Sequence, residues 1–248
     1  MRSSSIGWCL ALLGLASTSV ATAAADRIFY SNFDFAVLLL NEVNANVAGS
    51  QDLVELRVLS SGNAAGISLV QNPGPGGTSV VLATLADVPV AAGDLIVIHL
   101  APIAGPISET TSKADCTFSP PQCYSNAWDV QGGATGITYS DRVLAVLDAA
   151  GNVMDAAAFA LPAVVVPSTF PDAVAYIQSL GQWLPADCSG SPCTASSIPS
   201  VVQISADWTG LGNSATTGNS IARSGSAVDT NQAADWRVGA NTFGAGNP

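Results

Sequence analysis

The sequence predicts a mostly β-sheet domain of the sandwich type with one short helix. Short apolar runs rich in Val, Ile and Leu recur between turns that contain Gly, Pro and Asn, which is typical of strands. Charged residues make up only 10% of the chain, which contains 23 Gly and 14 Pro. This composition is typical of secreted β proteins with many turns. Short strands with frequent turns favour a sandwich over a parallel α/β sheet.

The expected strands lie between residues 36 and 159, and the first two have the clearest patterns. Residues 36–43 begin as a continuous apolar run, which indicates a central strand. Residues 52–59 alternate, with Val54, Leu56 and Val58 on one face and Glu55 and Arg57 on the other, which we expect to be the wet face. Further strands are expected at 66–71, 79–83, 95–100, 141–147 and 153–159, the last two around a hairpin turn at 149–152.

The expected helix lies late in the chain. It begins near Phe170, where Pro171 suits the first helical position, and ends at Gly181. The stretch 101–139 is loop-like, and the chain beyond the last cysteine is rich in Ser, Thr and Gly. No repeat that would indicate a solenoid or propeller occurs.

Residues 1–25 have the organisation of a cleavable signal peptide. Arg2 supplies the positive charge, residues 6–15 are largely apolar, and residues 17–25 are small. Two A-x-A sites place the expected cleavage between Ala23 and Asp26. The apolar part is too short to span a membrane, and Cys9 lies too early for a lipoprotein signal. We therefore expect an exported chain at the cell surface, in the periplasm or outside the cell, with residues 26–248 as a single domain without an integral membrane segment.

The cysteines predict disulfides. Removal of Cys9 with the signal peptide leaves Cys116, Cys123, Cys188 and Cys193. An even number in an exported chain indicates disulfides, and we expect the local pairs Cys116–Cys123 and Cys188–Cys193. Four cysteines allow three connectivities, so the pairing stays open. The alternative is one zinc site with four thiolates, but neither the spacing nor an oxidising compartment favours it.

The acidic balance narrows the possible partners. The formal net charge is −11, and the chain has only seven Lys and Arg residues. Nucleic-acid binding requires cations that neutralise phosphates, so we expect no nucleic-acid partner. Anionic membrane surfaces are disfavoured for the same reason. Solubility is the favoured explanation of the acidity.

The sequence contains no recognisable catalytic constellation. His99 is the single histidine and lies within an expected strand. A Ser-His-Asp set would have to use it, but no G-x-S-x-G elbow occurs, and phosphate-binding glycine motifs are also absent. One histidine excludes a metal site with several imidazoles. We therefore interpret His99 as a structural or surface residue and expect a protein that is not an enzyme.

Two glutamates are candidates for carboxylate chemistry. Glu42 and Glu55 are the glutamates expected within strands. A glycosidase needs two carboxyl groups that face each other across a cleft. We favour a structural interpretation, in which Glu42 bonds loop backbone and Glu55 pairs with an arginine on the wet face.

Calcium is the cofactor that the sequence leaves open. Asp229, Asn231 and Asp235 cluster in one loop, and Asp148 and Asp155 flank the expected hairpin. Calcium binds carboxylate, amide and carbonyl oxygens, but this spacing does not match an EF-hand. The favoured interpretation is that Asp229 and Asn231 cap turns. Asp235 would then fix the final segment against Arg223 or Arg237, and no cofactor is expected.

The beginning and the end of the chain resemble the lamin tail domain family. Residues 38–45 (LLLNEVNA) and 52–58 (DLVELRV) are similar to the two opening strands of the family, and 90–97 and 147–155 to its middle elements. Residues 218–223 (GNSIAR), 229–231 (DTN), 234–236 (ADW) and 244–247 (GAGN) are similar to its closing elements. The motif residues are Asn41, Glu42, Glu55, Leu56, Arg223, Asp229, Asn231, Asp235 and Trp236.

The resemblance implies an immunoglobulin-like β-sandwich across residues 26–248. Insertions at about 101–140 and 160–218 are longer than in a minimal tail domain and carry the predicted disulfides. The last motif lacks the proline usual in the family, and a coiled-coil rod and a prenylation signal are absent. The chain therefore resembles the exported bacterial type, and nuclear scaffolding and chromatin binding should not be carried over to it.

Three hypotheses for function follow. The leading one is an exported, non-enzymatic binding or structural module of the cell envelope or exterior, whose partner is an unidentified surface, polysaccharide or protein. The second is a secreted carboxylate-dependent hydrolase that acts on carbohydrate. The third is a self-assembling surface protein that polymerises through sheet edges, which its low charge makes physically reasonable.

Overall fold

A computed structural model describes residues 35–75, 79–101, 123–124, 126–162, 167–184, 202, 204–225 and 229–248. The predicted signal peptide lies outside the described residues, as do Cys116, Cys188 and Cys193. Cys123 is described: it is buried and disulfide-bonded. Its partner therefore lies outside the described residues, and the predicted pairing with Cys116 stays a prediction.

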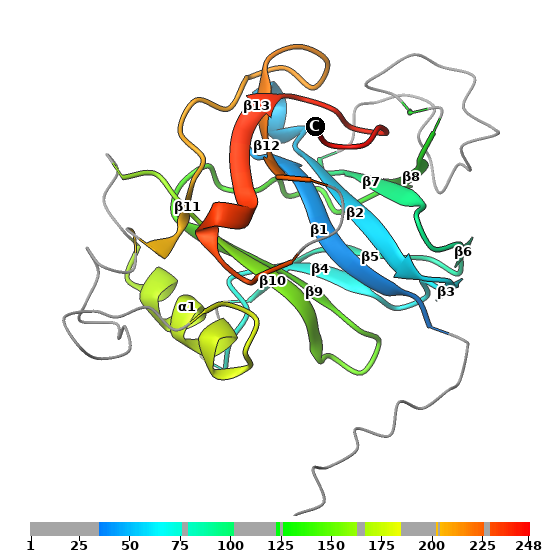
Figure 1. Ribbon diagram of the computed structural model, residues 1–248, viewed down its shortest axis with the longest axis horizontal. Helices are drawn as coiled ribbons and strands as arrows, with labels where there is room; N and C mark the ends of the chain where they lie inside the picture. The colour runs from blue at the N-terminus through cyan, green and yellow to red at the C-terminus, as the bar shows by residue number, and fades with distance from the viewer. Residues whose placement is uncertain are drawn as a thin grey trace, which may run out of the picture. The chain divides into compact units, whose positions relative to one another are not determined.

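The described residues form a mostly β-sheet sandwich, which confirms the predicted fold class (Figure 1). The first sheet has the order β13-β12-β1-β2-β7-β8, and the second has the order β11-β10-β9-β4-β5. The first sheet consists of β1 (Val37–Asn44), β2 (Leu53–Ser60), β7 (Leu95–His99), β8 (Trp128–Gln131), β12 (Asn219–Arg223) and β13 (Trp236–Ala240).

The second sheet consists of β4 (Ser68–Gln71), β5 (Val80–Thr84), β9 (Arg142–Leu147), β10 (Val153–Ala160) and β11 (Ala206–Asp207). A small ladder joins β3 (Gly62–Asn63) to β6 (Pro89–Val90), and two 3-10 turns, η1 (Ala48–Ser50) and η2 (Ala233–Asp235), lie in connections. The predicted hairpin between β9 and β10 is confirmed, with Gly151 at a φ of +85° in its turn. A left-handed conformation of this kind favours glycine.

Strand β1 is the centre of the first sheet. It pairs with β2 on one side and β12 on the other, and all its residues except Val37 are buried. Its inner face packs on β10 of the second sheet, where Leu38, Leu40 and Val43 enter the main core. The continuous apolar run therefore predicted a central strand correctly.

Aromatic rings fill one part of the main core. Phe159 at the end of β10 stacks on Trp208, with ring centroids 4.9 Å apart and an interplanar angle of 10°. It also meets Trp236 of β13 edge-on, at 4.9 Å and 84°. Offset-stacked and edge-to-face pairs of this kind are favourable beyond the area they bury. These contacts join both sheets and the segment after β11.

Helix α1 (Thr169–Ser179) contacts β9 of the second sheet and buries Phe170, Val174 and Ile177. Its end at Gly181 is confirmed. Gly181 has a φ of +72°, its N–H donates to the Gln178 carbonyl, and the Gln182 N–H donates to the Ile177 carbonyl. This is the Schellman arrangement.

The predicted start of the helix is wrong in one detail. Ser168 is the residue before the first helical position, so Pro171 is the third helical residue and not the first. Proline is still tolerated there, because the first N–H groups of a helix have no intrahelical acceptor.

Strand β8 corrects the prediction that 101–139 is loop-like. It pairs in parallel with β7 at the edge of the first sheet, with Val97 opposite Asp129 and His99 opposite Gln131. The strand is short and carries a buried aspartate, so neither its length nor its polarity distinguishes it from a loop. None of the helices in the described ranges is long and apolar enough to cross a membrane.

We expect Phe159→Ala to lower the free energy of unfolding by about 3–5 kcal/mol, because it removes two ring contacts and leaves a cavity between the sheets. Urea unfolding followed by tryptophan fluorescence measures this change. Leu184→Ala is the control, since this side chain is 49% exposed, and its effect should stay within about 0.5 kcal/mol. Equal losses in the two variants would contradict the proposed role of the aromatic contacts.

Candidate functional site

The outer face of the first sheet is covered, so the prediction of a wet face is wrong. Glu42 of β1 and Glu55 of β2 lie opposite each other in register, and both are fully buried. A second apolar cluster covers this face, and we call it the outer cluster. It comprises Val47, Leu53, Val97, Tyr124, Ala127, Ala215 and Phe243.

Glu42 binds the segment that follows β13. Its Oε1 accepts hydrogen bonds from Ser220 Oγ (2.5 Å) and from the Thr242 backbone N–H (2.7 Å). Its Oε2 accepts one from Thr242 Oγ1 (2.7 Å). The expectation that Glu42 bonds loop backbone is confirmed, and residues 241–248, here called the tail segment, are the loop concerned.

Glu55 binds the same tail segment, and its predicted pairing with an arginine is wrong. Its Oε1 accepts a hydrogen bond from Asn41 Nδ2 (2.5 Å), and its Oε2 accepts one from the Gly244 N–H (2.6 Å). Gly244 has a φ of +76°, and a Cβ there would lie 2.7 Å from Tyr124 Cβ. Glycine is therefore required for the tail segment to reach Glu55.

Burial changes the acidity of both glutamates. Desolvation raises the pKa of Glu55 to about 8, against the hydrogen bonds from Asn41 and Gly244, and the charge of Glu42 adds to the rise. Desolvation also raises the pKa of Glu42, against the hydrogen bonds from Ser220 and Thr242. Because like charges repel at close range, the pair retains a proton near neutral pH.

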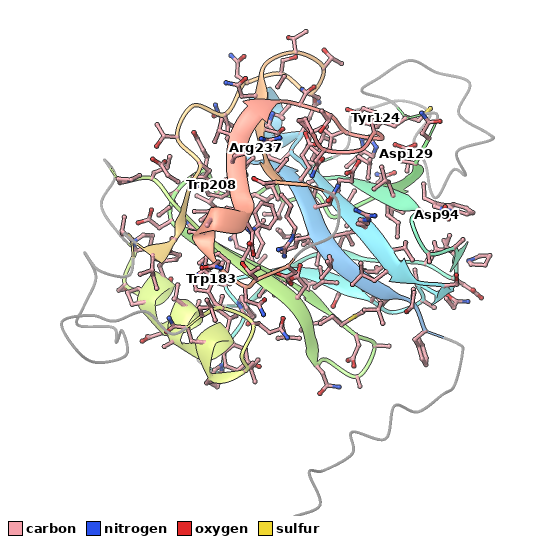
Figure 2. The ribbon with its side chains drawn as sticks, viewed as in Figure 1. Asp94, Tyr124, Asp129, Trp183, Trp208 and Arg237 are labelled. Atoms are coloured by element: carbon pink, nitrogen blue, oxygen red, sulfur yellow. The ribbon has the colours of Figure 1, made fainter. Side chains whose placement is uncertain are left out.

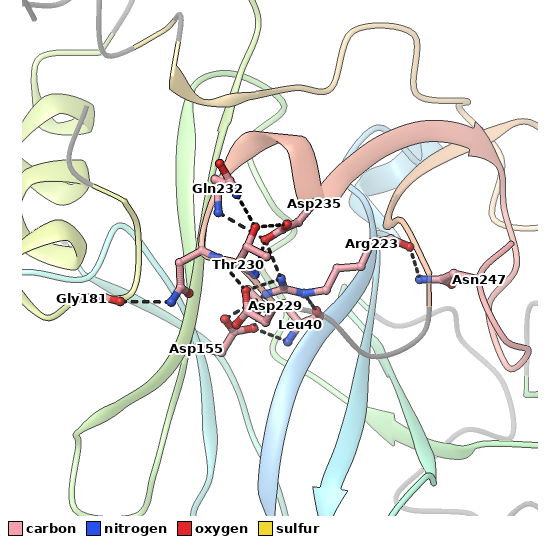
Figure 3. Close-up of polar contacts among 10 residues, drawn as sticks. Leu40, Asp155, Gly181, Arg223, Asp229, Thr230, Gln232, Asp235 and Asn247 are labelled. Atoms are coloured by element: carbon pink, nitrogen blue, oxygen red, sulfur yellow. Dashed lines mark hydrogen bonds and ion pairs between the residues drawn. The ribbon is translucent and has the colours of Figure 1, made fainter. Parts of the chain in front are cut away.

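Arg223 forms a second buried network, which joins the two sheets (Figure 3). From β12 its Nη2 donates to both carboxylate oxygens of Asp155 on β10, at 3.0 and 2.9 Å. Its Nε donates to the Leu40 carbonyl of β1 (2.6 Å), and Asp155 Oδ2 accepts the Leu40 N–H (2.7 Å). The guanidinium also lies 4.7 Å from the ring centroid of Trp236, at cation–π distance.

The acidic loop considered for calcium is attached to Arg223. Asp229 Oδ1 accepts a hydrogen bond from Arg223 Nη1 (2.7 Å), and Asp235 Oδ2 lies 3.6 Å from the same nitrogen. Asp229 also accepts the Asn231 N–H, and Asp235 accepts the N–H groups of Thr230 and Gln232. The predictions that Asp229 caps a turn and that Asp235 fixes the final segment against Arg223 are confirmed. The prediction that Asn231 caps a turn is wrong, because its Oδ1 has no hydrogen-bond partner among the residues that the structure describes and its Nδ2 donates to the Gly181 carbonyl. Within the described residues, no group of three or more His, Cys, Asp or Glu side chains is arranged to hold a metal ion.

His99 belongs to a buried pair that the sequence did not reveal. Its Nε2 lies 2.8 Å from Asp129 Oδ1, and Asp129 Oδ2 accepts the Tyr124 N–H (2.9 Å). Tyr124 and Asp129 lie at the same end of the first sheet (Figure 2), and the Tyr124 ring stacks on His99 with centroids 6.0 Å apart. In the described part of the chain, no Ser, Thr or Cys side chain is hydrogen-bonded to His99. The arrangement supports the structural interpretation of His99.

Most of the predicted motif residues come together in the two networks. Asn41, Glu42 and Glu55 lie in the first, and Arg223, Asp229, Asp235 and Trp236 lie in the second. Leu56 is instead a residue of the main core, and Asn231 links Gly181 to the acidic loop. The sequence does not single out Asp129, because its strand β8 falls in a stretch expected to be a loop. Asp155 is indicated only as a calcium candidate and as the end of the family-like element 147–155.

Residues 36–238 match the model of a protein family described as "protein second domain". The chain belongs to this family. The match extends from the start of β1 into β13, so it includes Glu42, Glu55 and Arg223 but not the tail segment. The description of this second-domain family names no activity, ligand or partner. The curated proteins contain no match to the chain.

We expect stability to fall as pH rises through about 8. The pKa of Glu55 is about 8 in the folded chain and about 4.5 in the unfolded chain, so the native state binds more protons between these two pH values. The contribution of Glu55 protonation to stability is therefore complete below about pH 4.5 and is lost as the pH rises through about 8. In Glu55→Gln this dependence should shrink by a few kcal/mol, since an amide can reproduce the protonated pattern if Asn41 rotates. Urea midpoints at about pH 5 and pH 9 measure it. Asp172→Asn, an exposed change, should leave the slope unaltered, and an equal slope in Glu55→Gln would contradict the assignment.

We expect Asp155→Asn to lower the free energy of unfolding by about 3–5 kcal/mol, because it leaves the buried guanidinium of Arg223 without its main carboxylate. Asp229→Asn is the matched comparison, since the Asp229 side chain is 19% exposed and water can replace part of its contact. Its loss should be clearly smaller. Chemical denaturation of both variants tests the order, and the reverse order would show that Asp155 is not the main partner of Arg223.

Proposed function

We propose that the chain is an exported, non-enzymatic binding or structural module of the cell envelope or exterior. One observation carries this proposal: Glu42, Glu55, Asp155 and His99, which catalysis would most readily use, are all buried and bonded to structural partners. A catalytic group has to reach its substrate within hydrogen-bond distance. These side chains instead hold strands and the tail segment together. This favours a function carried by the exposed surface of the protein, such as binding, over catalysis.

The lamin-tail resemblance supports the same proposal. Its motif residues from the two ends of the chain meet in the Glu42–Glu55 and Arg223 networks. This is expected if the motifs supply the contacts that join the first and last strands of a lamin-tail-like sandwich. We propose that the chain is a lamin-tail-like module of the exported type. The resemblance does not extend to nuclear partners.

The hydrolase alternative loses its best candidate pair. A glycosidase holds two carboxyl groups on either side of an accessible glycosidic bond. Glu42 and Glu55 lie on neighbouring strands under the tail segment, and each accepts hydrogen bonds from it. They do not face an open cleft, so we do not propose hydrolysis by this pair.

Self-assembly has one observation in its favour. Strand β5 is an edge of the second sheet, and its Val81 side chain is 60% exposed. Edge strands with exposed apolar residues can pair with another chain. The Gly133 N–H donates to the Leu82 carbonyl (2.7 Å), which occupies one backbone acceptor of this strand. Because the edge position and the exposed Val81 still favour pairing, assembly through β5 is a second candidate function.

We expect the purified protein to co-sediment with insoluble envelope or polysaccharide material. The protein is produced in an exporting host, purified as processed there, and added over a range of concentrations to intact cells, cell envelopes and insoluble polysaccharides. Saturable sedimentation is expected with at least one material. An unrelated exported protein of similar net charge is the control. Recovery in every supernatant would contradict the binding role, and sedimentation of the protein alone would favour self-assembly.

A further inference from the structure

Arg57 differs from the other arginines of the described residues. Arg223 is saturated by carboxylates, Arg142 Nη1 donates to the Asp141 carbonyl (2.6 Å), and Arg237 donates to a backbone oxygen of Pro248. In the described ranges, the Arg57 guanidinium has no hydrogen bond or ion pair. It lies on β2 two residues after Glu55, between Leu39 and Leu95 in the sheet register, and is half-buried. An unpaired guanidinium in this setting can bind an anion.

Arg57 lines a small pocket. The pocket has a volume of about 160 Å³ and is lined by Asn41, Arg57, Gly93, Leu95, Gly246 and Asn247. These residues come from β1, β2, the turn before β7, β7 itself and the tail segment. A Cβ at Gly93 or Gly246 would meet no atom within 4 Å, so both glycines leave their side of the pocket open. Pockets for whole small-molecule ligands are usually about 300–1,000 Å³, so this one suits a single unit of a larger molecule.

The charge and lining of the pocket indicate its ligand. A planar guanidinium pairs with carboxylate or phosphate through two parallel hydrogen bonds. The pocket offers one guanidinium, and the net charge of −11 opposes a doubly charged phosphate more than a singly charged carboxylate. Leu95 is an apolar residue of the lining, and Asn41 and Asn247 are its polar residues beside Arg57. A sugar ring matches that combination, because it presents C–H groups on its face and hydroxyl groups at its edge.

We propose that this pocket binds a uronic acid unit of an acidic polysaccharide, with the sugar carboxylate on the Arg57 guanidinium. The inference rests on the proposed binding function and names its ligand class. The tail segment supplies Gly246 and Asn247 to the pocket, and Glu42 and Glu55 hold that segment in place. Asn41 belongs to both sites, since it lines the pocket and donates to Glu55. The buried glutamates are thus positioning residues for the pocket.

The test is a titration of the exported chain with glucuronate as the probe, followed by saturation-transfer NMR and calorimetry. Glucose lacks the carboxylate, acetate lacks the sugar, and inorganic phosphate carries a different anion. We expect glucuronate to bind more tightly than all three. Arg57→Gln should weaken glucuronate binding at least about tenfold, and Arg57→Lys should weaken it less, because the charge remains but the planar fork is lost. Arg142→Gln, a change at an arginine of the second sheet that does not line the pocket, should bind glucuronate as the wild type does.

Several outcomes would overturn the proposal. These are equal glucuronate binding in Arg57→Gln, equal binding of acetate or phosphate, and equal competition by a short aspartate-containing peptide, which would assign the pocket to peptide carboxylates. Unchanged urea midpoints in the two Arg57 variants show that the comparison is between folded proteins. If wild type and Arg57→Gln sediment equally well with envelope material while glucuronate does not bind, this pocket assignment fails and the general binding function stands.

Discussion

Burial of strand β1 on both faces is the constraint on which the rest of the structure depends. Its inner face enters the core between the sheets, and its outer face lies under the outer cluster and the tail segment. Central strands of this kind are usually apolar, yet β1 carries Asn41, Glu42 and Asn44. Buried polar groups without partners are costly. The sandwich can therefore close only when other parts of the chain supply donors to this strand.

Those donors come mainly from β12 and the tail segment, which link the two networks. Ser220 of β12 donates to Glu42 on the outer face, while Arg223 at the end of the same strand donates to Leu40 and Asp155. Asn247 Nδ2 donates to the carbonyls of both Asn41 and Arg223. The Glu42–Glu55 network and the Arg223 network thus share a strand and a side chain. Loss of one should loosen the support of the other, as expected for polar networks with common members.

The sequence predicted what is local. The run before Glu42, the core face around Leu56 and the glycine after α1 each follow from short-range rules, and the structure confirms them. What covers a strand is not local. Alternation placed Glu55 opposite the core face, but its cover comes from Gly244, 189 residues along the chain, so the predicted wet face was wrong. The resemblance indicated which residues matter at both ends, although it gave no contacts between them.

Partners for charged side chains were harder still to predict. Arg223 meets Asp155 across 68 residues, and His99 meets Asp129 only because β7 and β8 pair in parallel. Parallel pairing requires a long connection between the strands, and no periodic signal in the sequence marks such a partner. The sequence therefore indicates most of the reactive side chains, though not Asp129, and it does not show which of them the fold uses for its own closure.

The same strand shows how the fold separates structural polar groups from accessible ones. Glu55 and Arg57 are two residues apart on β2 and point to the same face of the sheet. The tail segment covers Glu55 through the Gly244 N–H, but at Gly246, where no side chain projects, it leaves the pocket beside Arg57 open. A carboxylate sealed by backbone donors fixes the position of the segment, and the guanidinium beside it keeps its hydrogen-bonding capacity for another molecule. The position of the tail segment therefore determines which of the two charges is structural and which can bind a ligand.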